Sequence, residues 1–294
     1  MKKISAIIVA YNTKVILIDC LQNLGDCYPN MEIIVVDNGD DGSAEAVEIQ
    51  FPHVKVLRSG GNVGLAKGSN IGLQAATGDY LLYLGSDAFP KKDVLAGLVN
   101  YFEQNQDVGI ATAKLVLRTG KPDMDAHRGF PTPWAALTHF AGLDRFFPKS
   151  KVFNSYFQGY KDFSKSHEID MCISHFMMIR REVFDQIGRW EERFFLFGED
   201  VDFCYRAKQA GWKVMYLPQW EVTHYKGVGI GIRKESSDIS TASPETKKRS
   251  RKNSVDAMKF FYELHYKTKY PRFVTALVFL GIDALTFLRT KSNL

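Results

Sequence analysis

The sequence predicts an α/β fold, in which a mostly parallel sheet is flanked by helices and followed by a C-terminal helical extension. Short apolar runs rich in β-favouring residues recur between residues 5 and 116, and stretches with apolar residues at helical spacing separate them. Strands that are apolar throughout are typical of parallel sheets whose two faces are both covered by helices. The 294 residues can bury a sizeable core, in one large domain or two small ones.

The first part of the chain alternates these two patterns in a regular order. We expect strands at Ser5–Ala10, Glu32–Val36, Val54–Leu57, Tyr80–Leu84 and Val108–Val116. We expect helices at Val15–Leu24, Gly64–Ala76 and Asp93–Phe102. Ligands bind at the carboxyl ends of the strands in such sheets. The polar pairs that directly follow strands are therefore predicted to share one edge: Tyr11-Asn12, Asp37-Asn38 and Ser86-Asp87.

The second part is less regular. Residues 119–168 are rich in aromatic residues, Pro and Gly, and we expect a long excursion that forms a wall or lid. After it we expect a strand at Ile169–Ile179, helices at Arg181–Ile187 and Phe203–Gly211, and a last strand at Val214–Leu217 that ends at Pro218. The Gly-, Ser- and Lys-rich residues 227–252 predict a mobile loop.

Composition and charge narrow the class of protein. Hydrophobic residues at 45% and charged residues at 24% are ordinary for a globular domain. The net charge of +5 is modest, and much of the excess lies in Lys247–Lys252. We expect a solvated loop there, with anionic lipid as an alternative partner; no aromatic residues interleave the run, so nucleic acid is not expected. The four cysteines match no zinc spacing and predict reduced thiols in the cytoplasm.

The C-terminal tail has a distinct pattern. Phe273–Leu288 is apolar except at Thr275, Asp283 and Thr286. A transmembrane helix needs about 20 residues, so the segment is short for one. On a helix the polar positions fall on one narrow stripe, which predicts an amphipathic helix at a membrane surface. Packing on the protein itself, or against a second copy in a homodimer, is the alternative.

The most informative stretch is Glu199-Asp200-Val201-Asp202, where three carboxylates stand at a predicted helix start after the aromatic run Phe194–Phe197. Such carboxylates can take a proton, bind a cation or cap the helix. The helix N-terminus would lower their pKa, whereas desolvation by the aromatic residues would raise it. The sequence leaves these roles open.

Four other places carry candidate chemistry. Asp37 can accept a hydrogen bond from a ribose hydroxyl or a base N–H, or can simply form a turn. The Gly-rich loop Gly60–Asn70 can cradle phosphate, with Lys67 as its cation, or can be a flexible turn. Asp87 can hold a magnesium or manganese ion, or stand in a turn. His224 is either a structural histidine or a metal ligand.

Taken together, in order and spacing, these segments resemble the inverting glycosyltransferases of family 2, which have the Rossmann-like GT-A fold. The resemblance runs from about Ile4 to about Tyr225. Its later half is most similar to the rhamnosyltransferase-type branch that builds bacterial surface polysaccharides, as is the stretch Ser254–Tyr266. The segments that carry it are Ile7–Asn12, Val35–Gly39, Asn62–Gly64, Lys67–Asn70, Gly78–Asp87, Met178–Gly188, Phe194–Asp202, Arg206, Gly211-Trp212 and His224.

The resemblance implies a role for each matched residue. Asp200 would be the general base that deprotonates the acceptor hydroxyl. Asp87, with His224, would hold a divalent cation, Mn²⁺ or Mg²⁺. The donor nucleotide would be bound by Ala10, Tyr11, Asn12, Asp37, Asn62, Gly64, Lys67, Asn70, Ser86 and Arg206. The chain departs from the family at Gly85, where an Asp or Asn usually opens the metal-binding motif, and this leaves the metal affinity open.

The resemblance also implies an organisation and an activity. We expect a GT-A domain at 1–226, with a nucleotide-binding half at 1–118 and an acceptor and catalytic half at 119–226, followed by the mobile, helical and membrane-associating segment 227–294. The expected enzyme moves a sugar from dTDP-rhamnose or a UDP-sugar to a glycan or lipid-linked acceptor at the inner face of the cell membrane. The alternative is an inactive nucleotide-sugar-binding protein on the same fold.

Overall fold

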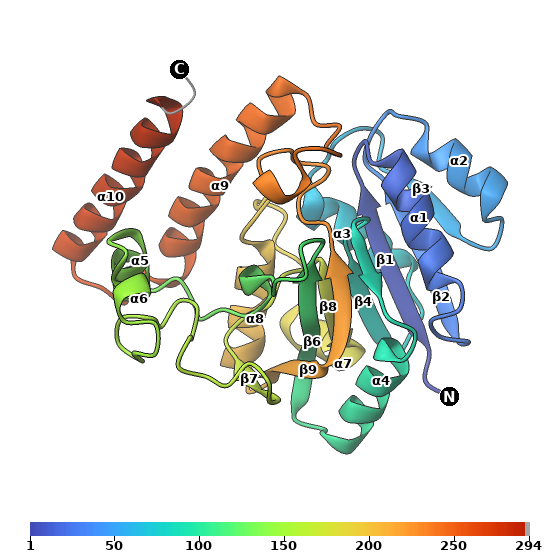
Figure 1. Ribbon diagram of the computed structural model, residues 1–294, viewed down its shortest axis with the longest axis horizontal. Coiled ribbons are helices and arrows are strands. Elements are labelled where there is room, and N and C mark those ends of the chain that lie inside the picture. The colour runs from blue at the N-terminus through green and yellow to red at the C-terminus, as the bar shows by residue number, and fades with distance from the viewer. Residues whose placement is uncertain (292–294) are drawn as a thin grey trace.

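The computed structural model describes residues 1–291, with side chains to residue 287, and forms one mixed sheet with helices on both faces (Figure 1). The strands are β1 (Ile4–Ala10), β2 (Met31–Asp37), β3 (Lys55–Arg58), β4 (Tyr80–Leu84), β5 (Ala88–Pro90), β6 (Val108–Leu117), β7 (His167–Ile169), β8 (Phe176–Arg180) and β9 (Lys213–His224). The helices are α1 (Lys14–Leu24), α2 (Ser43–Gln50), α3 (Leu65–Ala75), α4 (Val94–Gln104), α5 (Pro133–Phe140), α6 (Leu143–Phe146), α7 (Arg181–Ile187), α8 (Glu199–Gln209), α9 (Pro244–His265) and α10 (Arg272–Lys291), with 3₁₀ turns η1 (Met124–Ala126) and η2 (Lys234–Ser236).

The strand order is β3-β2-β1-β4-β8-β6-β9-β5, and β7 pairs with β9. The N-terminal strands are parallel, with β1 between β2 and β4, and β3 next to β2. In the C-terminal half β8 runs antiparallel to both β4 and β6, and β6 runs parallel to β9. The predicted α/β class is therefore confirmed. The parallel character belongs mainly to the first half, and the strands added later make the sheet mixed.

Alternate residues of the central strands lie on opposite faces of the sheet and pack in two apolar clusters. Ile8 packs with α1 and α4 in one cluster, whereas Ile7 packs with α3 and α8 in the other. Helix α3 can lie this close to β1 because it carries glycines. A Cβ added at Gly72 would come within 2.4 Å of Ile7 Cγ2, and one added at Gly68 within 2.8 Å of Val9 Cγ1. The prediction that this glycine-containing stretch is helical is confirmed, and the glycines allow close packing.

Several elements differ from the sequence expectation. Helix α2 was not expected, the excursion 119–168 contains η1, α5 and α6, and the strand expected at Ile169–Ile179 is two short strands. Strand β9 does not end at Pro218 but continues to His224. Its pairing with β6 shifts register between Leu217 and Glu221, and this bulge accommodates a proline that cannot donate to the ladder.

The basic run Lys247–Lys252 lies inside helix α9, so the prediction of a loop there was wrong. Ser243 Oγ accepts a hydrogen bond from Thr246 N at 3.2 Å and caps the helix, and Pro244 occupies its first turn. Farther along α9, Phe261 and Tyr262 are buried in an apolar cluster with Tyr205 of α8. The cap and this packing together offset the repulsion between neighbouring cations.

Helices α9 and α10 form a C-terminal hairpin on the opposite side of the view from α2 (Figure 1). The polar stripe of α10 faces α9: Thr275 Oγ1 lies 2.9 Å from Tyr262 Oη, and Lys259 Nζ donates to Asp283 at 2.5 Å. The opposite face exposes Phe273, Leu277 and Leu280. Within the described residues, no helix combines the length and apolarity needed to cross a membrane.

Candidate active site

The ends of β1 and β2 bring the first predicted binding residues together. Parallel pairing sets Ala10 opposite Asp37, and Asn38 N donates to Ala10 O at 2.8 Å. Asn12 adopts a left-handed conformation, with φ of 51°, and its Oδ1 accepts from Asp40 N at 2.9 Å. Gly39 has to be glycine because a Cβ there would lie 2.2 Å from Asn12 Oδ1. Asn12 thus fixes the loops after both strands.

A groove of about 380 Å³ opens beside Asp37. It is lined by Asp37, Gly39, Asp40, Gly42, Glu45, Arg58, Gly60 and Gly61. Asp37 Oδ1 accepts from Gly39 N at 3.2 Å, and burial raises the pKa of the Asp37 carboxyl. Asn62 Oδ1 accepts from Asn38 Nδ2 at 3.2 Å and from Gly64 N at 3.1 Å, which holds the Gly-rich loop against the end of β2.

Gly64 and Asn70 connect α3 to the segment that precedes α8. Gly64 has φ of 90°, and a Cβ there would lie 2.5 Å from Phe195 O. Asn70 Nδ2 donates to Trp190 O at 3.0 Å and to Glu192 Oε1 at 2.9 Å, and Trp190 N donates back to Asn70 Oδ1 at 3.1 Å. The polar groups of Asn70 therefore contact this segment of the protein. Lys67, on the same helix, is exposed.

Arg206 lies among groups of its own chain. Its guanidinium donates to Asp202 at 2.8 Å, to Ile187 O at 2.9 Å and to Arg189 O at 2.9 Å. Asp202 is fully buried, and its other oxygen lies 2.8 Å from His265 Nε2 of α9. Asp202 and Arg206 therefore join α7, α8 and α9, and the described contacts do not bring Arg206 to the groove beside Asp37.

A cluster of possible metal ligands lies at the ends of β4, β8 and β9. Asp87, His175 and His224 each offer one ligand atom, and these atoms all lie within 4.8 Å of one another. Ser86, next to Asp87, places its Oγ 3.0 Å from Thr13 Oγ1 below the end of β1. His175 was not predicted, because no motif of the sequence marks it. The antiparallel pairing of β8 with β4 brings it close to Asp87.

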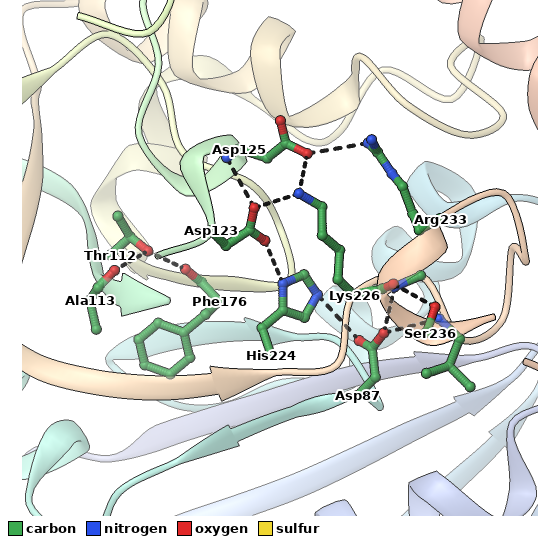
Figure 2. Close-up of polar contacts among 12 residues, drawn as sticks. Asp87, Thr112, Ala113, Asp123, Asp125, Phe176, His224, Lys226, Arg233 and Ser236 are labelled. Carbon is green, nitrogen blue, oxygen red and sulfur yellow. Dashed lines mark hydrogen bonds and ion pairs between the residues drawn. The ribbon is translucent and has the colours of Figure 1, made fainter. Parts of the chain in front are cut away.

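Asp123 sets the orientation of the His224 ring. Its Nδ1 lies 2.8 Å from Asp123 Oδ2, and its Nε2 points toward Asp87, 3.6 Å from Oδ1 (Figure 2). His224 is 2% exposed and its Nε2 has no hydrogen-bond partner in the described structure. Burial lowers the pKa of His224, but the carboxylates of Asp87 and Asp123 outweigh burial and raise it to about 9.

The second oxygen of Asp87 accepts from the backbone of the segment after β9. Gly227 N lies 2.9 Å and Val228 N 3.3 Å from Asp87 Oδ2. Burial raises the pKa of Asp87, yet the charge of His224 outweighs it and holds the pKa below its usual range. Asp87 is therefore an anion. A donor set of one carboxylate and two imidazoles fits a divalent cation, which would bind the deprotonated form of His224.

Charged residues of the excursion support this cluster. Lys226 donates to Asp123 Oδ1 at 2.6 Å and to Asp125 Oδ2 at 2.8 Å, and Arg233 also donates to Asp125, at 3.2 Å (Figure 2). Asp123 is 4% exposed, so these contacts balance its buried charge. Neither Asp123 nor Asp125 was predicted, because residues 119–168 match no motif.

Asp200 stands in the first turn of α8, at the position predicted for the base. It is buried, and its Oδ1 accepts from Val201 N at 2.8 Å. Burial raises the pKa of Asp200, the nearby guanidinium of Arg128 opposes that shift, and the net pKa lies above its usual value. Desolvation therefore outweighs the helix N-terminus. Glu199, also buried, has a pKa raised by burial and by the charge of Asp200.

The start of α9 crosses over the end of β1. Arg249 Nη2 donates to Tyr11 Oη at 2.8 Å, and its guanidinium lies 5.3 Å from the Tyr11 ring centroid and 5.7 Å from that of Phe195. Thr241 Oγ1 donates to Asn12 O at 2.8 Å. Residues far apart in sequence thus meet at the edge where nucleotide binding was predicted, and Arg249 was not predicted as one of them.

Comparisons with known proteins agree with this geometry. The model of the family described as "Glycosyl transferase family 2" matches residues 5–188. Rhamnosyltransferase WbbL of Escherichia coli is 25% identical over 74% of this chain and 82% of its own length. N-acetylglucosaminyl-diphospho-decaprenol L-rhamnosyltransferase of Mycobacterium tuberculosis is 25% identical over 68% of each chain.

Solved structures share the fold at low sequence identity. GalNAc-T7 with UDP, GalNAc and Mn²⁺ is similar at a TM-score of 0.57 and 18% identity, over 76% of this chain and 44% of that one. Mannosyltransferase PcManGT from Pyrobaculum calidifontis, in complex with GDP-Man and Mn²⁺, is similar at 0.55 and 16% identity, over 99% of this chain and 80% of that one. Together with the family match, these likenesses show that the chain belongs to glycosyl transferase family 2 and is a glycosyltransferase of the GT-A fold, of the rhamnosyltransferase-like kind.

Proposed function

We propose that this protein transfers a sugar from a nucleoside-diphosphate donor to a glycan or lipid-linked acceptor, with inversion at the anomeric carbon and with Asp200 as the general base. The observation that carries the proposal is the state of Asp200: a buried carboxylate with a raised pKa, beside the cation Arg128. A pKa nearer the working pH makes a carboxylate a more effective proton acceptor. Arg128 opposes the rise in pKa and so favours the ionised, proton-accepting form of Asp200.

The donor nucleotide is proposed to lie along the edge formed by β1, β2 and the Gly-rich loop. Asp37 would accept from the base or ribose at the mouth of the groove, and Tyr11 would help to hold the base. Ala10, Asn12, Asn62, Gly64 and Ser86 would contribute through the loops they hold, and Lys67 through its charge. For Asn70 and Arg206 the contacts with their own chain favour a supporting role instead.

Asp87 and His224 are proposed to hold a divalent cation, Mn²⁺ or Mg²⁺, next to the donor diphosphate. When bound, the cation would supply electrostatic stabilisation of the leaving diphosphate. Asp87 is already an anion, and the unpartnered His224 Nε2 faces it. Asp123 would keep His224 in that orientation through the contact at Nδ1.

The proton and bond changes of the proposed reaction are simple. The acceptor hydroxyl oxygen forms a bond to the anomeric carbon as its proton moves to an oxygen of Asp200. The bond from the anomeric carbon to the diphosphate oxygen breaks, and the nucleoside diphosphate leaves. One displacement needs one catalytic carboxylate and inverts the anomeric centre.

The relatives suggest which substrates to try first. Two of them are named rhamnosyltransferases, and the name of the mycobacterial one gives an acceptor linked through diphosphate to a polyprenol. We therefore propose dTDP-rhamnose as the first donor, UDP-sugars as the next, and a lipid-linked saccharide of a surface polysaccharide as the acceptor. A purified-enzyme assay with these donors tests the proposal. Two results would contradict it: undiminished transfer after Asp200 is replaced by a residue that cannot accept a proton, or no transfer from any of these donors.

We also propose that the α9–α10 hairpin contacts the cytoplasmic face of the membrane. The polar stripe of α10 is turned toward α9, so Phe273, Leu277 and Leu280 are 68%, 63% and 67% exposed. Exposed apolar patches of this kind are typical of interaction surfaces. The cations of α9 would add attraction to anionic lipid. Binding to anionic vesicles tests the proposal, and a dimer in solution that buries α10 would contradict it.

A further inference from the structure

His175 lies across from Gly85, the position where the metal-binding motif of the family usually has a carboxylate. The motif lacks its first carboxylate, because Gly85 stands there. Strand pairing sets Leu84 opposite Phe176, and Gly85 N continues the ladder by donating to His175 O at 2.9 Å. His175 is therefore fixed directly across from Gly85, at the same edge of the sheet as Asp87.

The imidazole of His175 occupies the space of a side chain at position 85. A Cβ added at Gly85 would lie 2.7 Å from His175 Cδ2 and 2.8 Å from Asp87 Oδ1. Contacts below 3.0 Å require a shift of one of the groups. A side chain at position 85 would therefore require the imidazole of His175 and the carboxylate of Asp87 to shift, so His175 now occupies space that such a side chain would need.

We infer that His175 replaces the missing carboxylate, so that Asp87, His175 and His224 together bind a divalent cation through one oxygen and two nitrogens. Two observations besides the cluster itself support this inference. His224 Nε2 is buried without a hydrogen-bond partner and faces Asp87. The rings of His175 and His224 lie 5.1 Å apart, close enough to share one ion. The inference rests on the proposed donor site and deepens it.

The donor set has a consequence for metal choice. Imidazole nitrogens favour borderline transition metals, whereas Mg²⁺ prefers oxygen ligands, and affinity at nitrogen-containing sites rises from Mn²⁺ to Co²⁺. The site should therefore bind Co²⁺ more tightly than Mn²⁺, and both more tightly than Mg²⁺. Exchanging one imidazole for a carboxylate should move the preference toward Mg²⁺.

The test counts nitrogen ligands in the full-length protein. Pulsed electron paramagnetic resonance of the Mn²⁺-loaded protein should detect two ¹⁴N couplings, and calorimetric titration should give the affinity for Co²⁺. His175→Ala should leave one coupling and weaken Co²⁺ binding at least tenfold, since even loss of an outer-shell partner weakens metal binding by about tenfold or more. The control His53→Ala removes an exposed histidine just before β3, at the far edge of the sheet, and should change neither value.

A second variant covers the case in which His175→Ala does not fold. Gly85→Asp with His175→Gly removes the close contact with the imidazole, leaves only the end of the Asp87 side chain to shift, and restores a carboxylate. The protein should fold, with one ¹⁴N coupling and a lower ratio of Co²⁺ to Mg²⁺ affinity than the unmodified chain. One coupling in the unmodified protein, or unchanged couplings and affinity in both variants, would overturn the inference. Two couplings without sugar transfer from any donor would overturn the proposed function and leave the metal site standing.

Discussion

The substitution Asp200→Asn tests the proposed base with little disturbance of the fold. Asparagine has nearly the same shape, and its Oδ1 can keep the hydrogen bond from Val201 N, which is 2.8 Å long. What disappears is the ability to accept a proton. General-base catalysis contributes about 10²–10⁴ in rate, or about 3–5 kcal/mol at 1.36 kcal/mol per tenfold. We therefore expect kcat to fall by about 10²–10⁴, with donor binding unchanged.

The assay measures kcat by release of the nucleoside diphosphate, and donor affinity by calorimetry. Because the base acts when deprotonated and burial raises the pKa of Asp200, the rate of the unmodified enzyme should fall with acid at a pH above the usual carboxyl range. Arg128→Gln, which removes the opposing cation, should move that acidic limb to higher pH. A kcat within threefold of the unmodified enzyme for Asp200→Asn would refute the base assignment.

Stability gives an independent reading of the same residue. The folded-state pKa of Asp200 is raised, so its contribution to stability is present at low pH and is lost as pH rises through the folded pKa. Ionisation of the buried carboxyl therefore costs stability, and Asp200→Asn should melt at the same or a higher temperature than the unmodified protein. A clear fall in melting temperature would mean that the carboxylate stabilises the fold.

Four further perturbations separate the other parts of the account. Asp202→Ala leaves Arg206 and His265 without their buried partner and should lower the free energy of unfolding, measured by urea titration, by about 3 kcal/mol. As a control, Asp238→Ala removes an exposed ion pair and should change that free energy by less than about 1 kcal/mol. Asp123→Asn should weaken Mn²⁺ binding about tenfold or more by calorimetry, because it loosens His224; equal affinity would exclude an orienting role. Arg249→Ala should alter KM for the donor more than kcat, since Arg249 lies on the Tyr11 ring; an effect on kcat alone would place it elsewhere. Replacing Phe273, Leu277 and Leu280 by Ser should abolish sedimentation with anionic vesicles at unchanged melting temperature, and undiminished sedimentation would rule out α10 as the contact.

Residues that terminate buried strands were predictable from the sequence. The apolar runs located β1, β2 and β4, and parallel pairing then brought Asp37 and Asp87 to the same edge. Asp200 was located by its motif, but which effect controls its pKa needed the structure, since burial and the helix N-terminus act in opposite directions. The outcome depends on how deeply Asp200 is buried and on Arg128, which comes from a distant segment.

Other residues and roles were not predicted from the sequence, for reasons that differ from case to case. His175 belongs to no motif, and its place follows from the antiparallel pairing of β8 with β4, a register that local sequence does not encode. The roles of Arg206 and of the basic run had local signals. Asp202 and Arg206 stand four residues apart on a helix, which favours a side-chain pair. Ser243 followed by Pro244 is typical of a helix start and could have placed the basic run in a helix.

The most direct test of the central claim is the stereochemistry of the product. The purified protein, with Mn²⁺, would be incubated with dTDP-rhamnose or a UDP-sugar and a polyprenyl-diphosphate-linked saccharide, and the new glycosidic bond assigned by nuclear magnetic resonance. A single displacement with Asp200 as base predicts a product whose anomeric configuration is opposite to that of the donor. A product that retains the donor configuration would contradict the account.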